Sequence, residues 1–135
     1  MITLNIMNAE HKKAFYGFQQ GGHNAALMYR KFAEITKKPE FRQAYLEAAK
    51  DEGRHAAVIA RYTGVTMRPK AFQANMLGIL YRILPKKLVH LGVSKGEYFG
   101  GNGYRPYIGD TYPELKGIME DEYRHGDIFR GLSKR

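Results

Sequence analysis

A five-residue string, Asp-Glu-x-Arg-His, occurs twice in the sequence, at residues 51–55 and 121–125. In each copy the glutamate and the histidine are three positions apart, so a helix would place both side chains on one face. Burying carboxylates and imidazoles is costly unless they are paired or coordinate a metal. The two copies supply four candidate metal ligands: Glu52, His55, Glu122 and His125. A donor set of carboxylates and imidazoles without thiolates suits iron or manganese.

The same string has a simpler interpretation on a solvated helix. Its aspartate and arginine are also three positions apart, so Asp51 with Arg54 and Asp121 with Arg124 can form surface salt bridges. A single copy would favour this interpretation. Two copies in register within a repeated unit favour a metal site, because convergent carboxylates and imidazoles are hard to explain by packing alone.

Other matches show that the string belongs to a longer repeat. Two pairs of residues recur in the same order before each copy: Tyr29-Arg30 and Tyr104-Arg105, then Pro39-Glu40 and Pro113-Glu114. These ordered matches indicate a duplicated helical hairpin. An approximate two-fold axis between two such hairpins would aim both Glu-x-x-His pairs at one interior point. In this alignment Glu97 corresponds to Gly22, so Glu97 is either a further ligand or a helix-surface glutamate.

Periodic apolar residues predict the helices that must position these groups. The expected helices cover residues 8–35, 40–62, 71–84, 86–107 and 113–132. Asn8 is suited to cap the first helix, Pro39 to open the second and Gly64 to end it. The sequence shows no alternating strand pattern. The predicted fold is all-α, with two helical hairpins joined by a longer, partly helical crossover in a single domain, residues 1–135.

Composition excludes several kinds of protein. The 135 residues contain no cysteine, which removes disulfides, thiolate catalysis, zinc fingers and iron–sulfur clusters. The formal net charge is +9, but Lys and Arg are dispersed, which favours a solvated basic surface over nucleic-acid binding. The N-terminus lacks the basic start and long apolar run of a signal peptide. We therefore expect a soluble cytoplasmic protein.

The most apolar stretch, residues 76–91, is interrupted by Arg82, Pro85, Lys86 and Lys87. It falls short of the roughly 20 apolar residues that a membrane-spanning helix needs, so we expect no membrane partner. The default interpretation of its apolar stripe is that these side chains pack in the core. The stripe can alternatively cover the interface of a homodimer, which is the expected assembly.

Taken together, these motifs resemble the rubrerythrin branch of the ferritin-like superfamily, over roughly residues 10–132. The resemblance also rests on Glu97 followed after seven positions by Tyr104, and on Asn-Ala-Ala-Leu-Met-Tyr at residues 24–29. It implies a ferritin-like four-helix bundle that holds two iron ions, with manganese as the other metal. The ligands that it implies are Glu52, His55, Glu97, Glu122 and His125, with Tyr29 and Tyr104 as neighbours of the ligands. The implied activity is peroxide reduction, oxygen detoxification or iron handling by a non-haem di-iron oxidoreductase.

Two departures from the family pattern open an alternative. Rubrerythrins of the classical type append a cysteine-ligated iron domain that supplies electrons, so redox activity here needs an external electron donor. The position expected to hold a glutamate in the first helix is Gly22, with Gln19 one turn earlier as a poor substitute. The alternative is a degenerate ferritin-like scaffold with one metal or none, acting as a binding or structural protein. On that alternative, Gly22→Glu should increase metal occupancy.

Glycines also gather near the expected site. They are Gly21, Gly22, Gly100, Gly101 and Gly103. Their missing side chains let the helices over residues 8–35 and 86–107 approach closely, open a cavity for a ligand or water, or make the helix over residues 86–107 locally irregular.

Overall fold

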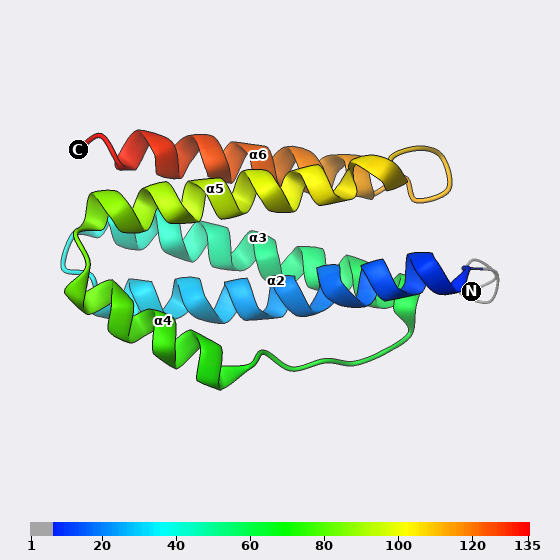
Figure 1. Cartoon of the computed structure of the whole chain (residues 1–135), viewed down its shortest axis with the longest axis horizontal. Coiled ribbons are helices and arrows are strands. Elements are labelled where there is room, and N and C mark those ends of the chain that lie inside the picture. The colour runs from blue at the N-terminus through cyan, green and yellow to red at the C-terminus, as the bar shows by residue number, and fades with distance from the viewer. Residues whose placement is uncertain (1–6) are drawn as a thin grey trace. The chain divides into compact units, whose positions relative to one another are not determined.

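The computed structural model describes residues 7–135, and every regular element in this range is helical. The five α-helices are α2 (Ala9–Ile35), α3 (Pro39–Thr63), α4 (Ala71–Ile83), α5 (Lys86–Tyr104) and α6 (Leu115–Leu132), and a 3₁₀ turn, η1 (Arg105–Tyr107), follows α5 (Figure 1). The all-α fold class is therefore confirmed.

The chain divides into two compact units, the first ending at Ile79 and the second beginning at Leu80, within α4. Helices α2 and α3 pack together in the first unit, and α5 and α6 pack together in the second. Each unit thus contains one of the expected helical hairpins. Their combination into one ferritin-like bundle, as a single domain, stays a prediction.

The ends of the first hairpin follow from local backbone chemistry. The Asn8 side chain accepts a hydrogen bond of 2.8 Å from the His11 backbone N–H, which satisfies a free donor at the start of α2. Pro39 occupies the first turn of α3, where its missing N–H costs nothing. Gly64 ends α3 with a φ of 71°, a left-handed conformation that favours glycine. All three predicted boundary residues are confirmed.

Aromatic side chains form much of the contact between α2 and α3. Phe15 meets Tyr62 edge-on at 5.7 Å between ring centroids, and Phe32 meets Tyr45 in a similar way at 5.5 Å. All four residues are buried. Such pairs add about 0.5–1.5 kcal/mol each beyond the burial of their area, so they fix how the two helices face each other.

The second hairpin differs from expectation at its turn. Helix α5 ends at Tyr104 and not at residue 107, and α6 begins at Leu115, two positions after Pro113. Pro106 has no N–H to continue the α-helical hydrogen bonds, so the chain tightens into η1. The Leu115 N–H donates to the Tyr112 carbonyl at 3.1 Å, in a separate turn that precedes α6.

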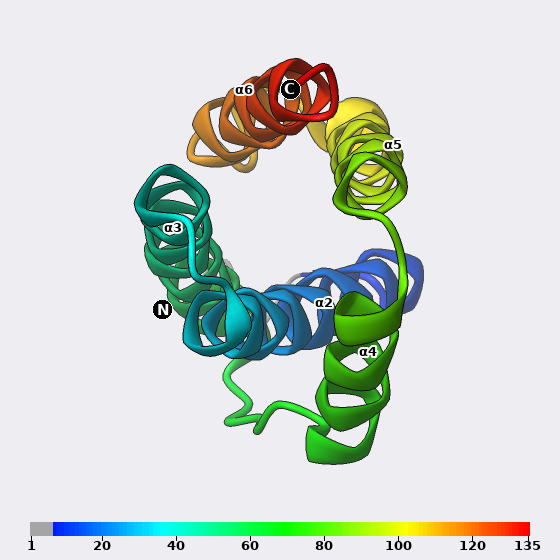
Figure 2. The same ribbon diagram turned by 90° about the vertical axis from the view of Figure 1, so that its left-hand side faces the viewer.

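Helices α5 and α6 run side by side (Figures 1 and 2) and interlock through two tyrosine–glycine pairs. A Cβ atom on Gly126 of α6 would lie 2.6 Å from the Tyr98 ring of α5, and a Cβ on Gly101 of α5 would lie 2.6 Å from the Tyr123 ring of α6. Each ring thus occupies the space that a side chain would fill on the opposite helix.

Hydrogen bonds hold both rings in place. The Tyr123 hydroxyl donates to Asn102 Oδ1 at 2.6 Å, and the Tyr98 hydroxyl donates to the Asp127 carboxylate. The bond to Asp127 raises the pKa of the Tyr98 hydroxyl above its ordinary value. The Tyr98 hydroxyl therefore stays a protonated donor at neutral pH. Together the two hydrogen bonds help to keep α5 and α6 in register.

We expect Gly126→Ala to destabilise the second unit by about 1–3 kcal/mol, because the new methyl group must displace the Tyr98 ring. Urea unfolding followed by circular dichroism measures the change. Gly117→Ala on the same helix is the control, since a Cβ there meets nothing within 4 Å. It should be neutral or stabilising by about 0.5–1 kcal/mol. If the Gly126→Ala and Gly117→Ala proteins unfold alike, the interlock does not hold the hairpin.

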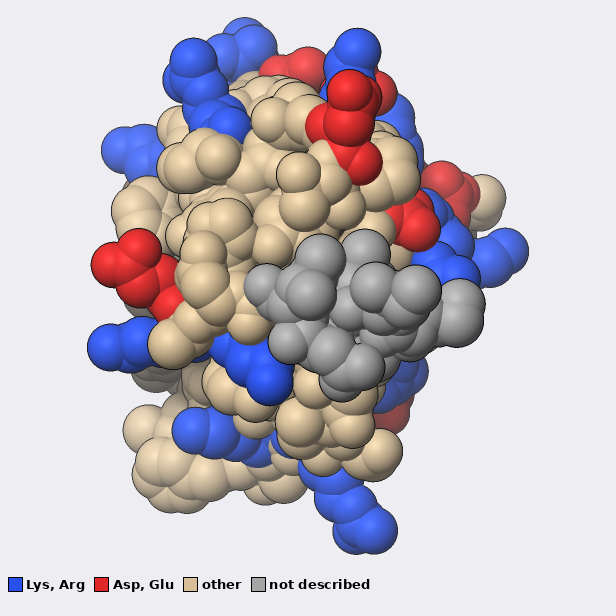
Figure 3. All heavy atoms as spheres, turned by 90° about the vertical axis from the view of Figure 1, so that its right-hand side faces the viewer, with Lys and Arg blue, Asp and Glu red and all other residues tan. Residues whose placement is uncertain are grey.

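Charged side chains of both signs occur on the face drawn in Figure 3, where Lys and Arg are spread over the surface with Asp and Glu among them. The expectation that nucleic acid is not a partner stays a prediction.

Candidate metal centre

The residues of the repeated string lie on two different faces of the helices that carry it, α3 and α6. On the outward face, Arg54 pairs with Asp51 and Arg124 pairs with Asp121, both at 3.1 Å. The arginine side chains are 54% and 50% exposed, so these are surface salt bridges worth less than about 1 kcal/mol each. The simpler interpretation of the string is therefore correct for its aspartates and arginines.

The glutamates and histidines of the same string point the other way. Glu52 and His55 on α3 are 4% and 1% exposed, and Glu122 and His125 on α6 are 7% and 2% exposed. Surface pairing cannot explain four buried groups of this kind, since burial of a carboxylate needs a compensating charge or hydrogen bonds. These four residues thus keep the role of candidate ligands.

In the first unit the candidate ligands are Glu52 and His55. Glu52 Oε1 lies 3.6 Å from His55 Nδ1, one turn along α3. This separation is longer than a good hydrogen bond and leaves both atoms on the same face of the helix.

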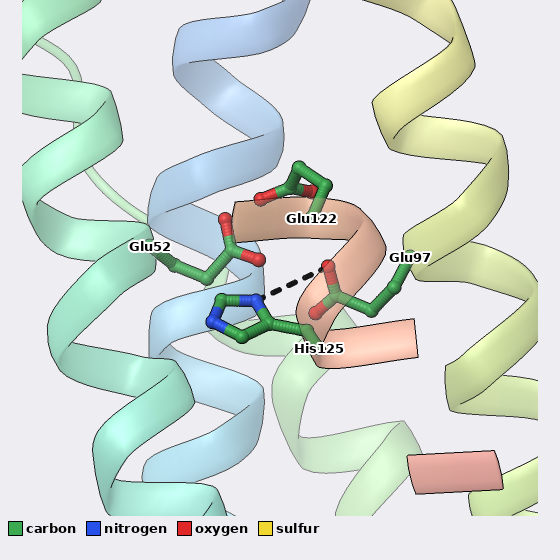
Figure 4. A group of neighbouring side chains, drawn as sticks. All are labelled: Glu52, Glu97, Glu122 and His125. Carbon is green, nitrogen blue, oxygen red and sulfur yellow. Dashed lines mark ion pairs between the residues drawn. The ribbon is translucent and has the colours of Figure 1, made fainter. Parts of the chain in front are cut away.

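In the second unit three candidate ligands come together from two helices. Glu97 on α5 places its Oε1 atom 3.4 Å from Nδ1 of His125 on α6, the pair joined by the dashed line in Figure 4. Glu97, Glu122 and His125 each offer a ligand atom within 4.8 Å of the others. Glu97 is only 5% exposed, so it is not a helix-surface glutamate. We refer to Glu97, Glu122 and His125 as the second-unit triad.

A glycine makes room for one member of the triad. A Cβ atom on Gly100 would lie 3.1 Å from Glu122 Oε2, closer than side chains normally approach. The missing side chain at this position therefore gives the Glu122 carboxylate its space against α5.

Gly22, which the repeat aligns with Glu97, has a different environment. A Cβ atom there would lie 3.1 Å from both the Ala56 Cβ and the Glu52 backbone carbonyl. Gly22 thus lets α2 touch α3, its partner in the same hairpin. A glutamate cannot simply be restored at this position, because it would have to push α2 away from the backbone of α3. These contacts argue against the expectation that Gly22→Glu raises metal occupancy.

Gln19 does not substitute for the missing carboxylate. Its amide nitrogen donates to the Val65 carbonyl at 2.7 Å, and its amide oxygen accepts from the Thr63 hydroxyl at 2.6 Å. Gln19 is fully buried by these contacts. Its role is therefore to tie α2 to the end of α3 and to the segment that follows.

Tyr29 and Tyr104, the expected neighbours of the ligands, are both buried. The Tyr29 ring stacks on Tyr45 with 6.5 Å between centroids, a contact within the first hairpin. Their interaction with the ligands stays a prediction.

The residues that sequence reasoning missed are the interlocking tyrosines. Tyr98 is followed after three positions by Gly101, and Tyr123 is followed after three positions by Gly126. This Tyr-x-x-Gly spacing occurs once on α5 and once on α6, overlapping the ligand-bearing turns. The spacing was a usable signal, because antiparallel helices can seat each tyrosine against the glycine of the other.

Comparison of the chain with protein-family models, with curated proteins and with solved structures finds no match. The site must therefore be judged on its own donor set and geometry.

Proposed function

We propose that the protein binds iron or manganese at a carboxylate–histidine centre built on the second-unit triad. The observation that carries the proposal is the buried triad itself. Two buried carboxylates, Glu97 and Glu122, repel each other unless a positive charge lies between them. A divalent cation supplies that charge, and the His125 imidazole supplies a nitrogen ligand.

The spacing within the triad is compatible with a first-row transition metal. Glu97 Oε1 and His125 Nδ1 lie 3.4 Å apart, close enough for both atoms to hold one ion at metal–ligand distances of about 2.1 Å. Oxygen and imidazole donors without thiolate favour iron or manganese over copper(I) or structural zinc.

Glu52 and His55 are proposed to complete a second metal position, as in the rubrerythrin branch of the ferritin-like superfamily. The repeat supports this, because it gives the first hairpin the same Glu-x-x-His pair on the buried face of α3. In this proposal Glu52, Glu97 and Glu122 would hold the two ions through their carboxylates, and His55 and His125 would each hold one ion. A pair of iron ions supplies the electrons for peroxide reduction or oxygen detoxification, and an external donor restores them. The carboxylates and imidazoles hold the ions and exclude bulk water.

Metal content tests this function. The purified apoprotein is loaded with Fe(II) without oxygen, desalted, and measured for iron by elemental analysis, with Mn(II) in a parallel sample. About two ions per chain are expected for a complete centre. Absence of both metals would contradict the proposal, and iron-dependent peroxide consumption with an added reductant would extend it to activity.

A second candidate function follows from Gly22. Since α2 contacts α3 at this glycine, the described part of the first unit has no glutamate at the position that the repeat aligns with Glu97, and its candidate ligands from the repeat are Glu52 and His55. The protein would then hold a single ion at the second-unit triad and serve as a metal-binding or structural scaffold without redox turnover. One ion per chain and no peroxide consumption would support this candidate over the di-iron centre.

A further inference from the structure

Helix α4 presents an apolar face to solvent. Its exposed apolar residues fall at helical intervals of four, three, one and three positions: Phe72, Met76, Ile79, Leu80 and Ile83. This spacing places them along one side of the helix. Phe72 is 78% exposed and Ile83 is 70% exposed, values that a side chain within a core would not have.

The opposite side of α4 is also apolar, and it is buried. Ala74, Gly78 and Tyr81 form this inner side, and a Cβ on Gly78 would lie 3.7 Å from the Ile35 side chain of α2. The start of α4 is anchored as well, since Asn24 Oδ1 accepts from the Lys70 backbone N–H at 2.8 Å. These contacts turn the inner side of α4 toward α2, while the side chains of its outer face remain exposed.

The charged residues on α4 and on the chain segments directly before and after it are all basic. Between Glu52 and Glu97 the chain contains no Asp or Glu. Exposed Lys70, Arg82 and Lys87 lie before, within and after the apolar stripe. A second copy of this chain would bring like charges together at this face, whereas an anionic surface would complement them.

We propose that the outer face of α4 docks the protein on an anionic lipid bilayer. Phe72, Ile79 and Ile83 enter the boundary between headgroups and acyl chains, while the flanking basic side chains contact anionic headgroups. The docking is peripheral, because in residues 7–135 no helix combines the length and apolarity needed to cross a membrane. Such docking needs no membrane-spanning helix, and it competes with a homodimer for the same apolar stripe.

Vesicle co-sedimentation of the full chain tests the proposal. The vesicles are phosphatidylcholine alone or with roughly one-third phosphatidylglycerol. We expect binding to the anionic vesicles that weakens as salt is raised, and little binding to phosphatidylcholine alone. The double variant Phe72→Ser/Ile83→Ser should weaken binding about 10-fold or more, since both side chains are the most exposed of the stripe.

Phe99→Ser is the matched control. Phe99 is an aromatic residue on α5 that is 82% exposed and lies outside the stripe, so its loss should leave vesicle binding unchanged. Equal loss in the control and the double variant would overturn the proposal, as would absence of binding to anionic vesicles. Light scattering tests whether a second copy of the chain covers the face instead. If the protein binds no vesicles and forms a dimer that the Phe72→Ser/Ile83→Ser variant dissociates, the face belongs to a dimer interface and the proposal is overturned.

Discussion

Replacing His125 with alanine is expected to lower the affinity for Fe(II) or Mn(II) by roughly 100-fold or more. The substitution removes the only nitrogen ligand of the second-unit triad and leaves the Glu97 and Glu122 carboxylates. Glu97→Gln should have an effect of similar size, because the amide keeps the shape of the side chain but loses the negative charge. Competition with a chelator of known affinity measures both variants.

Asp121→Asn is the control for these ligand variants. Asp121 lies beside Glu122 on α6, but its partner Arg124 is on the outward face and half exposed. Its loss should change metal affinity little and the free energy of unfolding by less than about 1 kcal/mol. Unchanged affinity in the His125→Ala protein would show that the triad does not bind the metal.

Gly22→Glu is expected to destabilise the first unit by at least about 2 kcal/mol. The new side chain starts 3.1 Å from the Ala56 Cβ and from the Glu52 carbonyl, and a backbone carbonyl cannot move aside as a flexible side chain does. Introducing a carboxylate at a buried position adds a further cost. Thermal and urea unfolding of the metal-free protein measure the change.

Gly21→Glu is the matched control for Gly22→Glu, since the neighbouring position is exposed and a Cβ there meets nothing within 4 Å. Glutamate is a better helix former than glycine, so Gly21→Glu should stabilise α2 by up to about 1 kcal/mol. A Gly22→Glu protein that is as stable as the natural protein and binds an additional metal ion would show that α2 can move away from α3.

The fold was predictable from sequence where local chemistry decides it. Asn8 as an N-cap and Gly64 in a left-handed conformation are properties of a few neighbouring residues, and both are confirmed. The end of α5 was placed too late, because apolar periodicity continues through Pro106 while the α-helical hydrogen bonds do not. The end of such a helix depends on which backbone N–H groups can donate hydrogen bonds, and the spacing of apolar residues does not show this.

The candidate site was predictable as a set of residues, and its surroundings were not. The duplicated string identified Glu122 and His125 before their burial was known, because the repeat made coincidence a poor explanation. Gly22 is explained by the close contact of α2 with α3 at this position. That contact depends on how α2 is rotated against α3, and the spacing of residues within α2 does not specify this rotation. The contact observed at Gly22 is with Ala56 and with the backbone carbonyl of Glu52, both on α3.

In the proposed metal centre, the tyrosine–glycine interlock would influence which ions bind. Tyr98 and Tyr123 brace α5 and α6 on the same turns that carry Glu97 and Glu122, and none of these bracing contacts uses a ligand atom. The positions of the candidate ligands Glu97 and Glu122 are thus set by contacts that do not require a metal. Ligand side chains that are already ordered would lose less conformational entropy when an ion binds. The same rigidity would disfavour larger cations such as calcium, whose longer oxygen distances need a more flexible coordination sphere.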